Sequence, residues 1–211
     1  MADPICNVLT PATNFDLVTL PEAKMLIGVS ANDTSDDAHI QLLIQIASDQ
    51  VARLCNRTFA RERVREEWRE LASGLRIFPH HWPIATADVE TVESPEGTFL
   101  ASTDYEVEEY SGKISYYGGF TEPVVITYTG GYILPGGAPA ALKNAVGLLI
   151  WQQRLRTTSA AAGGIRMLAH KSARVVYHDP NKILAAALGA AKTPMGSDVM
   201  QLLSHFIHYE V

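Results

Sequence analysis

Two pairs of histidines are the first residues whose type and spacing suggest metal chemistry. His80 and His81 are adjacent, so on an extended chain their side chains point apart and do not easily share one metal ion. His205 and His208 are spaced i, i+3, which would bring two imidazoles together on an expected final helix. A structural zinc site needs four ligands, and no Cys-x-x-Cys or His-Glu-x-x-His pattern adds to these. We therefore expect no metal site and no cofactor.

A short acidic cluster raises the alternative of a metal-dependent nuclease or other hydrolase. Glu106 and Glu108 share one face of an expected strand, and Glu109 follows them. Such a site also needs a third ligand and usually a lysine, and the spacing supports neither. No Walker A, Gly-x-Gly-x-x-Gly or Gly-x-Ser-x-Gly pattern is present. We expect a solvated strand face, no catalytic residues and a non-enzymatic protein, with the hydrolase as the minor alternative.

A run of arginines is the strongest candidate for a contact surface. Interfaces favour arginine because its planar guanidinium binds a carboxylate through two hydrogen bonds. Arg61, Arg63 and Arg65 alternate with Glu62 and Glu66, which favours salt-bridged surfaces between chains or strands over a nucleic-acid patch. The predicted subunit–subunit contacts are Arg53, Arg57, Arg61, Arg63, Arg65 and Arg69.

Charge is distributed unevenly along the 211 residues, whose formal net charge is −6. Residues 88–122 hold nine acidic side chains and one lysine, whereas residues 139–211 hold three acidic and eight basic ones. This asymmetry indicates separate contact faces. The sequence is 47% hydrophobic, enough for a packed core, but has no run of about 18 apolar residues that would span a membrane. Two cysteines without a pattern indicate reduced thiols in a cytosolic product.

Helical sequence patterns lie on both sides of a β-rich middle region. These elements would position the candidate residues described above. Thr19 and Glu22 have capping-box spacing, which predicts a helix over residues 19–28. Pro139 suits the first turn of a helix that runs to about residue 156. A longer helix over residues 35–56 carries one apolar stripe, formed by Ile40, Leu43, Ile44, Ala47, Val51 and Leu54.

The middle of the chain alternates polar and apolar residues between turn signals, which predicts short strands. Residues 58–70 are ambiguous between a helix and an extended arm. The expected fold is α+β: a small α-helical bundle with an inserted antiparallel β-sheet and a hinged C-terminal arm. The expected domains are a discontinuous helical core (17–60 and 139–156), a β insert (61–134), a flexible loop and arm (157–196) and a C-terminal docking segment (197–211).

The last segment of the chain is apolar and aromatic and follows a Thr-Pro-Met-Gly break. It either folds back on its own core or docks into a partner as a helix in a groove. Before the break, residues 165–178 are a strand or a looped arm, and residues 179–191 an alanine-rich helix. The predicted docking residues are Val199, Leu202, Leu203, Phe206, Ile207 and Tyr209.

Four segments in this order resemble the phage head–tail connector (adaptor, or head-completion) protein family. Residues 17–30 and 33–59 resemble its opening and first long helix, and residues 124–132, ending in Thr-Gly-Gly-Tyr, resemble the strand before the helix at 139–153. The branch is that of longer adaptors with a β insert, found in siphophage-like prophages and gene-transfer agents. The resemblance depends on the order of the parts, because none of these motifs is diagnostic by itself.

The resemblance implies a virion structural protein of a tailed phage or phage-like particle, located in the neck. Such proteins form a ring, usually of twelve copies, under the portal, where they extend the DNA channel and join the head to the tail. The implied partners are the portal protein, a stopper or other neck or tail protein, further copies of this chain, and DNA that passes without sequence-specific binding. No membrane is implied. A tail-side neck protein, such as a stopper or tail terminator, is the alternative.

Two groups of residues acquire expected roles from this resemblance. The C-terminal arm would dock on the portal, as the arms of this family do. The acidic face of Glu106, Glu108 and Glu109 would lie on the channel or tail side, where negative charge repels the phosphate backbone and lets DNA slide. A compact chain of this length has a radius of gyration of roughly 17 Å, so a channel around a duplex needs several copies.

Overall fold

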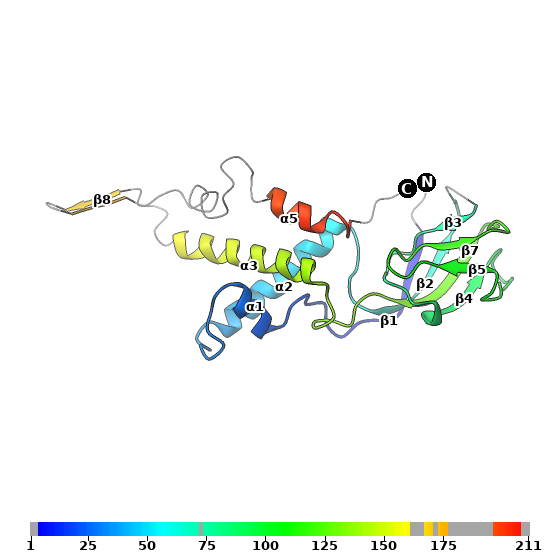
Figure 1. The fold of residues 1–211 in the computed structure, drawn as a ribbon, viewed down its shortest axis with the longest axis horizontal. Helices are drawn as coiled ribbons and strands as arrows, with labels where there is room; N and C mark the ends of the chain where they lie inside the picture. Colours follow the sequence, from blue (N-terminus) through cyan, green and yellow to red (C-terminus); the bar gives the residue numbers. More distant parts are fainter. Residues whose placement is uncertain (1–3, 72–73, 161–166, 171–172, 177–195, 208–211) are drawn as a thin grey trace. The chain divides into compact units, whose positions relative to one another are not determined.

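The computed structural model has two compact units, which Figure 1 shows in colours that follow the sequence. The described residues are 4–71, 74–160, 167–170, 173–176 and 196–207. We call the two parts the sheet unit (Met1–Leu17, Ala52–Ala138 and Ile207–Val211) and the helical unit (Val18–Val51 and Pro139–Phe206). None of the helices within the described ranges combines the length and the apolar character needed to cross a membrane.

The helical unit is built from α1 (Leu20–Leu26), α2 (Asp37–Cys55, whose last turn falls in the sheet unit), α3 (Ala140–Ala160) and α5 (Gly196–Leu203). The predicted capping box begins α1: Thr19 Oγ accepts from the Glu22 N–H, and the Glu22 carboxylate accepts from the Thr19 N–H at 2.8 Å. The apolar core of this unit lies at helical spacing on α2 and α3 and includes Ile40, Leu43, Ile44, Ala47, Leu142, Ala145, Val146 and Ile150.

A short hairpin completes the described part of the helical unit. Strands β8 (Met167–His170) and β9 (Ala173–Val176) pair with each other in antiparallel register. The sequence left this region open between a strand and a looped arm, and a hairpin is what forms. The alanine-rich helix expected over 179–191 lies outside the described residues, as do residues 193–195 of the expected hinge.

The sheet unit contains two antiparallel sheets. The larger has the order β1 (Ile5–Thr10), β2 (Glu62–Trp68), β7 (Val124–Gly130) and β4 (Val89–Glu93), and the smaller has the order β3 (Arg76–Ile77), β6 (Ile114–Tyr116) and β5 (Tyr105–Val107). The N-terminal strand β1 is therefore an edge strand, paired only with β2 in the sheet. A short 3-10 helix, η1 (Thr86–Asp88), leads into β4.

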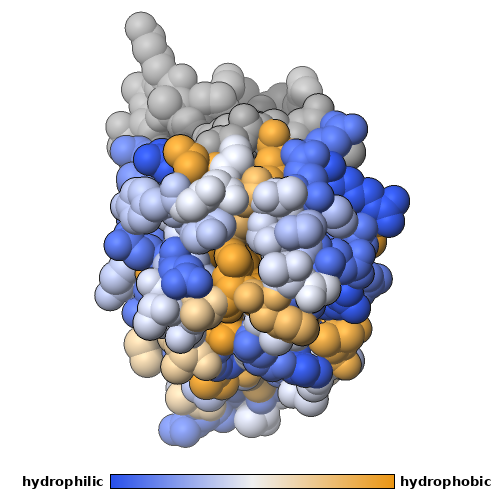
Figure 2. Space-filling model, turned by 90° about the vertical axis from the view of Figure 1, so that its right-hand side faces the viewer, coloured by the Kyte–Doolittle hydropathy of each residue, from blue (hydrophilic) through white to orange (hydrophobic). Residues whose placement is uncertain are grey.

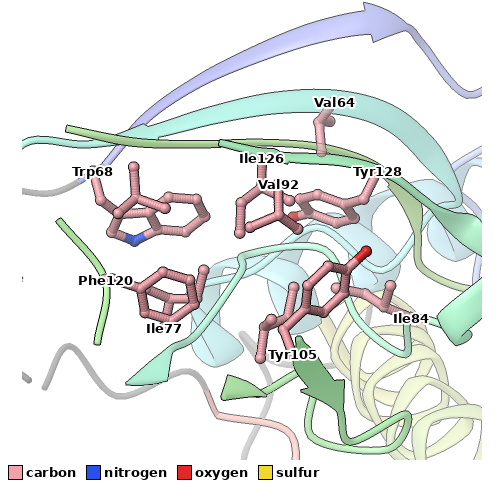
Figure 3. Close-up of a cluster of buried hydrophobic side chains, with 11 residues drawn as sticks. Val64, Trp68, Ile77, Ile84, Val92, Tyr105, Phe120, Ile126 and Tyr128 are labelled. Atoms are coloured by element: carbon pink, nitrogen blue, oxygen red, sulfur yellow. The ribbon is translucent and has the colours of Figure 1, made fainter. Parts of the chain in front are cut away.

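The core of the sheet unit lies between its two sheets. Along β2 and β7 alternate side chains point inward, as the two-residue period of a strand requires. Figure 3 shows Trp68, Val92 and Ile126 on one side of this core, facing Ile77, Tyr105 and Phe120 on the other. Both rows are buried, so burial of apolar and aromatic surface stabilises the pairing of the sheets.

The chain enters and leaves the sheet unit's inserted part through one hydrogen-bonded pair of segments. Arg61 N–H donates to the Tyr132 carbonyl at 2.9 Å, and Tyr132 N–H donates to the Phe59 carbonyl at 2.7 Å. Gly131 has φ +106°, and a side chain there would collide with the Ala60 carbonyl. The glycine is therefore required where the two segments approach each other.

The predicted α+β fold with an inserted antiparallel sheet is confirmed, and the element boundaries needed three corrections. Strand β1 was missed, because a lone edge strand gives a weak local signal. The ambiguous region 58–70 contains a central strand, β2, since its alternating charged residues face opposite sides of a sheet. Residues 157–160, expected in a flexible loop, continue helix α3.

Candidate functional site

A ladder of ion pairs crosses the outer face of the larger sheet. Arg63 of β2 binds Glu90 of β4 through two hydrogen bonds, Nε to Oε1 at 2.7 Å and Nη2 to Oε2 at 2.6 Å. Arg61 binds Asp88 at 2.7 Å and Arg65 binds Glu96 at 3.0 Å. We call these six residues the charged ladder. Its side chains are partly exposed, so it presents an ordered, charge-balanced surface.

The arginines of the ladder do not pair with the glutamates that alternate with them in the sequence. Glu62 and Glu66 point to the buried side of β2, because successive strand residues face opposite sides. The partners come from β4 and the adjoining turns, across the intervening strand β7. The expected salt-bridged surface therefore exists between strands of one subunit. Contact with a second subunit stays a prediction.

The other three arginines of the predicted contact set occupy different environments. Arg69 is exposed and pairs with Glu67 at 2.6 Å, and Arg53 is exposed on α2. Arg57 is buried, with its guanidinium 3.3 Å from the centre of the Trp82 ring and 4.6 Å from that of Phe59, and it donates to the Trp82 carbonyl. Burial lowers the pKa of Arg57 to about 9. A side chain enclosed in this way does not present itself to another subunit, so Arg57 leaves the set.

The predicted acidic face is exposed in the structure. Glu106, Glu108 and Glu109 all lie at or just after strand β5. Glu108 pairs with Lys113 at 2.6 Å and accepts from the Ser111 hydroxyl, and these contacts lower its pKa. Glu106 accepts a hydrogen bond from the Tyr117 hydroxyl at 3.3 Å. The exposure of these three glutamates fits a solvated surface. That this surface faces the channel or the tail side stays a prediction.

Hydrophobic side chains also reach the surface, beside the charged groups. Figure 2 shows one face of the molecule, where hydrophilic residues lie on both flanks and hydrophobic residues gather between them. On the edge strand β1, Ile5, Val8 and Leu9 are each more than two-fifths exposed. Phe99 and Tyr110 are exposed further along the sheet unit. The surface of the sheet unit thus carries both charged and apolar side chains, the two kinds that protein interfaces combine.

The C-terminal docking residues divide into buried and accessible groups. Helix α5 packs on α3, and Val199 and Leu203 of α5 are 3% and 0% exposed. Of the two sequence-based alternatives, this part of the segment folds back on its own unit. Leu202, Phe206 and Ile207 are partly exposed, and Tyr209 lies outside the described residues. A partner can reach the partly exposed residues without unfolding the helical unit.

A polar cluster that we did not expect from the sequence lies buried inside the sheet unit. Glu66 on β2 is fully buried; it accepts from the Tyr128 hydroxyl at 2.5 Å and from the His80 N–H at 3.2 Å. His81 is 4% exposed, and its Nε2 lies 3.1 Å from Glu62 Oε2. We call Glu62, Glu66, His80, His81 and Tyr128 the buried polar cluster.

The electrostatics of this cluster centre on Glu66. Burial alone would raise the pKa of Glu66, but the polar contacts of His80, His81 and Tyr128 and the charge on His80 outweigh it and lower that pKa to about 2. Burial and the Glu66 charge raise the pKa of the Tyr128 phenol well above its usual value. The carboxylate is therefore ionised and the phenol neutral, with the phenol as donor.

The expectation that His80 and His81 diverge is wrong. The chain bends at these two residues instead of running extended, so both rings approach the same carboxylate. His80 Nδ1 lies 3.4 Å and His81 Nδ1 3.7 Å from Glu66. Of the other pair, His205 is exposed on the segment after α5, and His208 lies outside the described residues.

Comparisons with known proteins give matches in structure but not in sequence. No protein-family model and no curated protein matches this chain. A chain from the neck of an empty GTA particle, computed with C6 symmetry, has a TM-score of 0.56 and 16% identity, over 98% of this chain and 97% of that one. A chain from the virion of a native gene transfer agent (GTA) particle has a TM-score of 0.56 and 18% identity at the same coverage. A third, from the neck of a native GTA particle computed with C12 symmetry, has a TM-score of 0.52 and 17% identity. At these identities the matches show a shared fold over nearly the whole chain.

Proposed function

We propose that this protein is a structural head–tail adaptor of a tailed phage or phage-like particle. It forms a ring under the portal, extends the DNA channel and joins the head to the neck and tail, without enzymatic activity. The observation that carries the proposal is the likeness in fold, over 98% of the chain, to chains from gene transfer agent necks and virions. In this proposal the protein is assembled in the host cytoplasm and resides in the neck of the virion.

A ring is the form in which a chain of this size can surround DNA. A single compact chain of 211 residues has a radius of gyration of roughly 17 Å and cannot enclose a duplex. Head-to-tail contacts between copies close into a ring, and twelve copies agree with the C12 symmetry applied to one of the matched necks. The partners are other copies, the portal protein and a stopper or other neck protein, and DNA passes without sequence-specific contacts.

The described surfaces supply residues for each contact. The subunit contacts use the exposed arginines Arg53, Arg61, Arg63, Arg65 and Arg69 together with the carboxylates of the charged ladder. The portal contact uses the partly exposed residues Leu202, Phe206 and Ile207, together with Tyr209 outside the described residues, while Val199 and Leu203 hold α5 on the helical unit. The acidic face at Glu106, Glu108 and Glu109 lies toward the channel or the tail side.

A tail-side neck protein, either a stopper or a tail terminator, is the second candidate. The same observation favours it, because the matched structures are of whole necks and of a virion. A metal-dependent hydrolase at the acidic face has less support, since Glu108 is paired with Lys113 and all three glutamates are exposed.

Electron microscopy of this protein mixed with the portal protein from the same genome tests the proposal. We expect a new ring of density under the portal, with a symmetry that gives the copy number. The matched control is the triple variant Leu202→Asp, Phe206→Asp and Ile207→Asp, which should leave the portals bare if these residues dock. Bare portals with the wild-type protein at high concentration would overturn the adaptor role and favour the tail-side candidate.

A further inference from the structure

Three side chains of types that bind transition metals meet at the edge of the buried polar cluster. They are Cys6 on β1, Glu66 on β2 and His81 after β3, and one ligand atom of each lies within 4.8 Å of the other two. The strand register explains the first pair, since Cys6 is directly opposite Glu66 and the two side chains share one face of the sheet. The bend at His81 brings the third.

The imidazole of His81 is held with one nitrogen unused. Its Nε2 lies 3.1 Å from Glu62 Oε2, and a hydrogen bond to that carboxylate places the ring proton on Nε2. Its Nδ1 is buried, has no hydrogen-bond partner and lies 3.7 Å from Glu66 Oε1. A carboxylate that fixes one histidine nitrogen while the other faces a group of ligands is the arrangement that orients histidine in metal sites.

The carboxylates of Glu66 and Glu62 are also held in place, by hydrogen bonds from groups outside the proposed ligand set. The Tyr128 hydroxyl and the His80 N–H donate to the Glu66 carboxylate, which fixes its orientation. Glu62 Oε1 accepts from the Ala12 N–H at 2.9 Å while Oε2 faces His81. The ligand set is therefore positioned before any ion binds, apart from Cys6 on the exposed edge strand.

We propose that Cys6 Sγ, a Glu66 carboxylate oxygen and His81 Nδ1 bind one Zn²⁺ ion. Thiolate, imidazole and carboxylate together favour zinc over magnesium or calcium. Tetrahedral bonds of about 2.0–2.3 Å place neighbouring ligands roughly 3.3–3.8 Å apart, so a group within 4.8 Å closes on the ion by small side-chain movements. A water molecule completes the fourth position, and Cys6 releases its thiol proton on binding.

Zinc at this position would fasten the N-terminal strand to the sheet unit. Among the described strands, β1 pairs with β2 alone, and the metal would add a link between β1, β2 and the bend at His81. The site is independent of the adaptor proposal, since it concerns the stability of one subunit. Without metal, His81 Nε2 keeps its contact with Glu62 while Nδ1 stays beside Glu66, and this purely structural polar network is the competing outcome.

Titration of the full-length, chelator-treated protein with Zn²⁺ or Co²⁺ tests the site. We expect about one equivalent of Zn²⁺ to bind and to raise the melting temperature, and Co²⁺ to give a thiolate charge-transfer band. Cys6→Ser should abolish that band and weaken zinc binding at least tenfold, about 1.4 kcal/mol. The fold should survive, because Cys6 lies on an exposed edge strand.

Cys55→Ala is the matched control, because it removes the other thiol and leaves all three ligands in place. This variant should keep the cobalt band and the zinc affinity of the wild type. His81→Gln, which removes the Nδ1 ligand, should lose both. The proposal is overturned if the wild type binds neither metal, or if Cys6→Ser binds zinc as tightly as Cys55→Ala does; the buried cluster is then a structural polar network alone.

Discussion

The helical unit and the sheet unit bury different kinds of side chain. Among the side chains of α2 and α3 that the structure describes, the buried ones are apolar apart from Ser48. The main charged exception in the described part of the helical unit is Lys24, which reaches Asp37 and two backbone carbonyls from a buried stem. The sheet unit encloses Arg57, Glu62, Glu66 and His81 within its core. An apolar core needs only side chains of suitable size, whereas a buried polar cluster needs every partner present. The sheet unit should therefore be the less tolerant of polar-to-apolar change.

A charge placed in the helical core gives the largest expected effect. Ile44→Asp puts an unpaired carboxylate at a position with no exposure, at a cost above about 4 kcal/mol, so the helical unit should not fold. Circular dichroism and thermal melting would show the loss of helix. Leu42→Asp, on the same helix but 52% exposed, is the control and should melt like the wild type. A native melt for Ile44→Asp would contradict the assigned core.

Removal of the central carboxylate tests the buried polar cluster. Glu66→Ala leaves the His80 N–H and the Tyr128 hydroxyl without their acceptor, and removing one member of such a buried charged network costs about 3–5 kcal/mol. Urea denaturation measures the loss. The control, Glu67→Ala, changes the next residue on the outer face, where the partner is the exposed Arg69, and should cost less than about 1 kcal/mol. Equal losses would mean that the buried cluster has no special role in stability.

Shortening a buried side chain of α5 tests whether this helix belongs to the helical core. Leu203→Ala removes a fully buried side chain and should cost about 2–4 kcal/mol. Met200→Ala, at a position that is 41% exposed, is the matched control with a much smaller effect. If both variants keep wild-type stability, α5 does not belong to the core. All of its apolar residues would then be candidates for docking into a partner, as the sequence-based alternative has it.

Acid should weaken the helical unit slightly through Glu22. Burial alone would raise the pKa of Glu22, but hydrogen bonds from Lys143 and Thr19 outweigh it and lower that pKa from 4.5. The contribution of Glu22 is present above pH 4.5 and is lost as the pH falls through the lowered folded-state pKa. The loss should be about 0.5 kcal/mol or less, because the pair is largely solvated. Glu22→Gln keeps the cap and should flatten this part of a stability–pH profile; an unchanged profile would contradict the assignment.

The charged ladder should give the smallest change of all. Arg63→Gln removes a two-fold hydrogen bond to Glu90, but both side chains are about two-fifths exposed and solvent screens them. The urea midpoint should stay within experimental scatter of the wild type. The single variant Glu90→Gln and the double variant complete a double-mutant cycle for this ion pair. A large coupling energy would contradict the prediction, because the ladder would then stabilise the subunit as much as the buried polar cluster does.

The sequence predicted well those features that local spacing encodes. The capping box at Thr19 and the apolar stripe of α2 depend on residues within one or two turns of each other, and both are present in the structure. Leu54, at the end of that stripe, is 39% exposed, since the pattern does not show where the covering elements end.

Long-range pairing is what the sequence could not supply. Cys6 and Glu66 are 60 residues apart and adjacent only through the pairing of β1 with β2. Glu62 and Glu66 looked like partners of the neighbouring arginines, and only the strand periodicity around them signals that they face inward. A search for charged residues at the inward positions of a strand would have flagged the buried polar cluster.

The paired segments at Phe59–Arg61 and Gly131–Tyr132 bear on how this protein can change over evolution. Because the two ends of the intervening stretch are as close as neighbouring strands, about 4.8 Å, insertions and deletions inside it leave its points of attachment in place. The loops between these points can thus change in length without moving the two segments that lead to the helices. Relatives should accordingly differ most in length between residues 62 and 130, and the glycine at position 131 should persist among them.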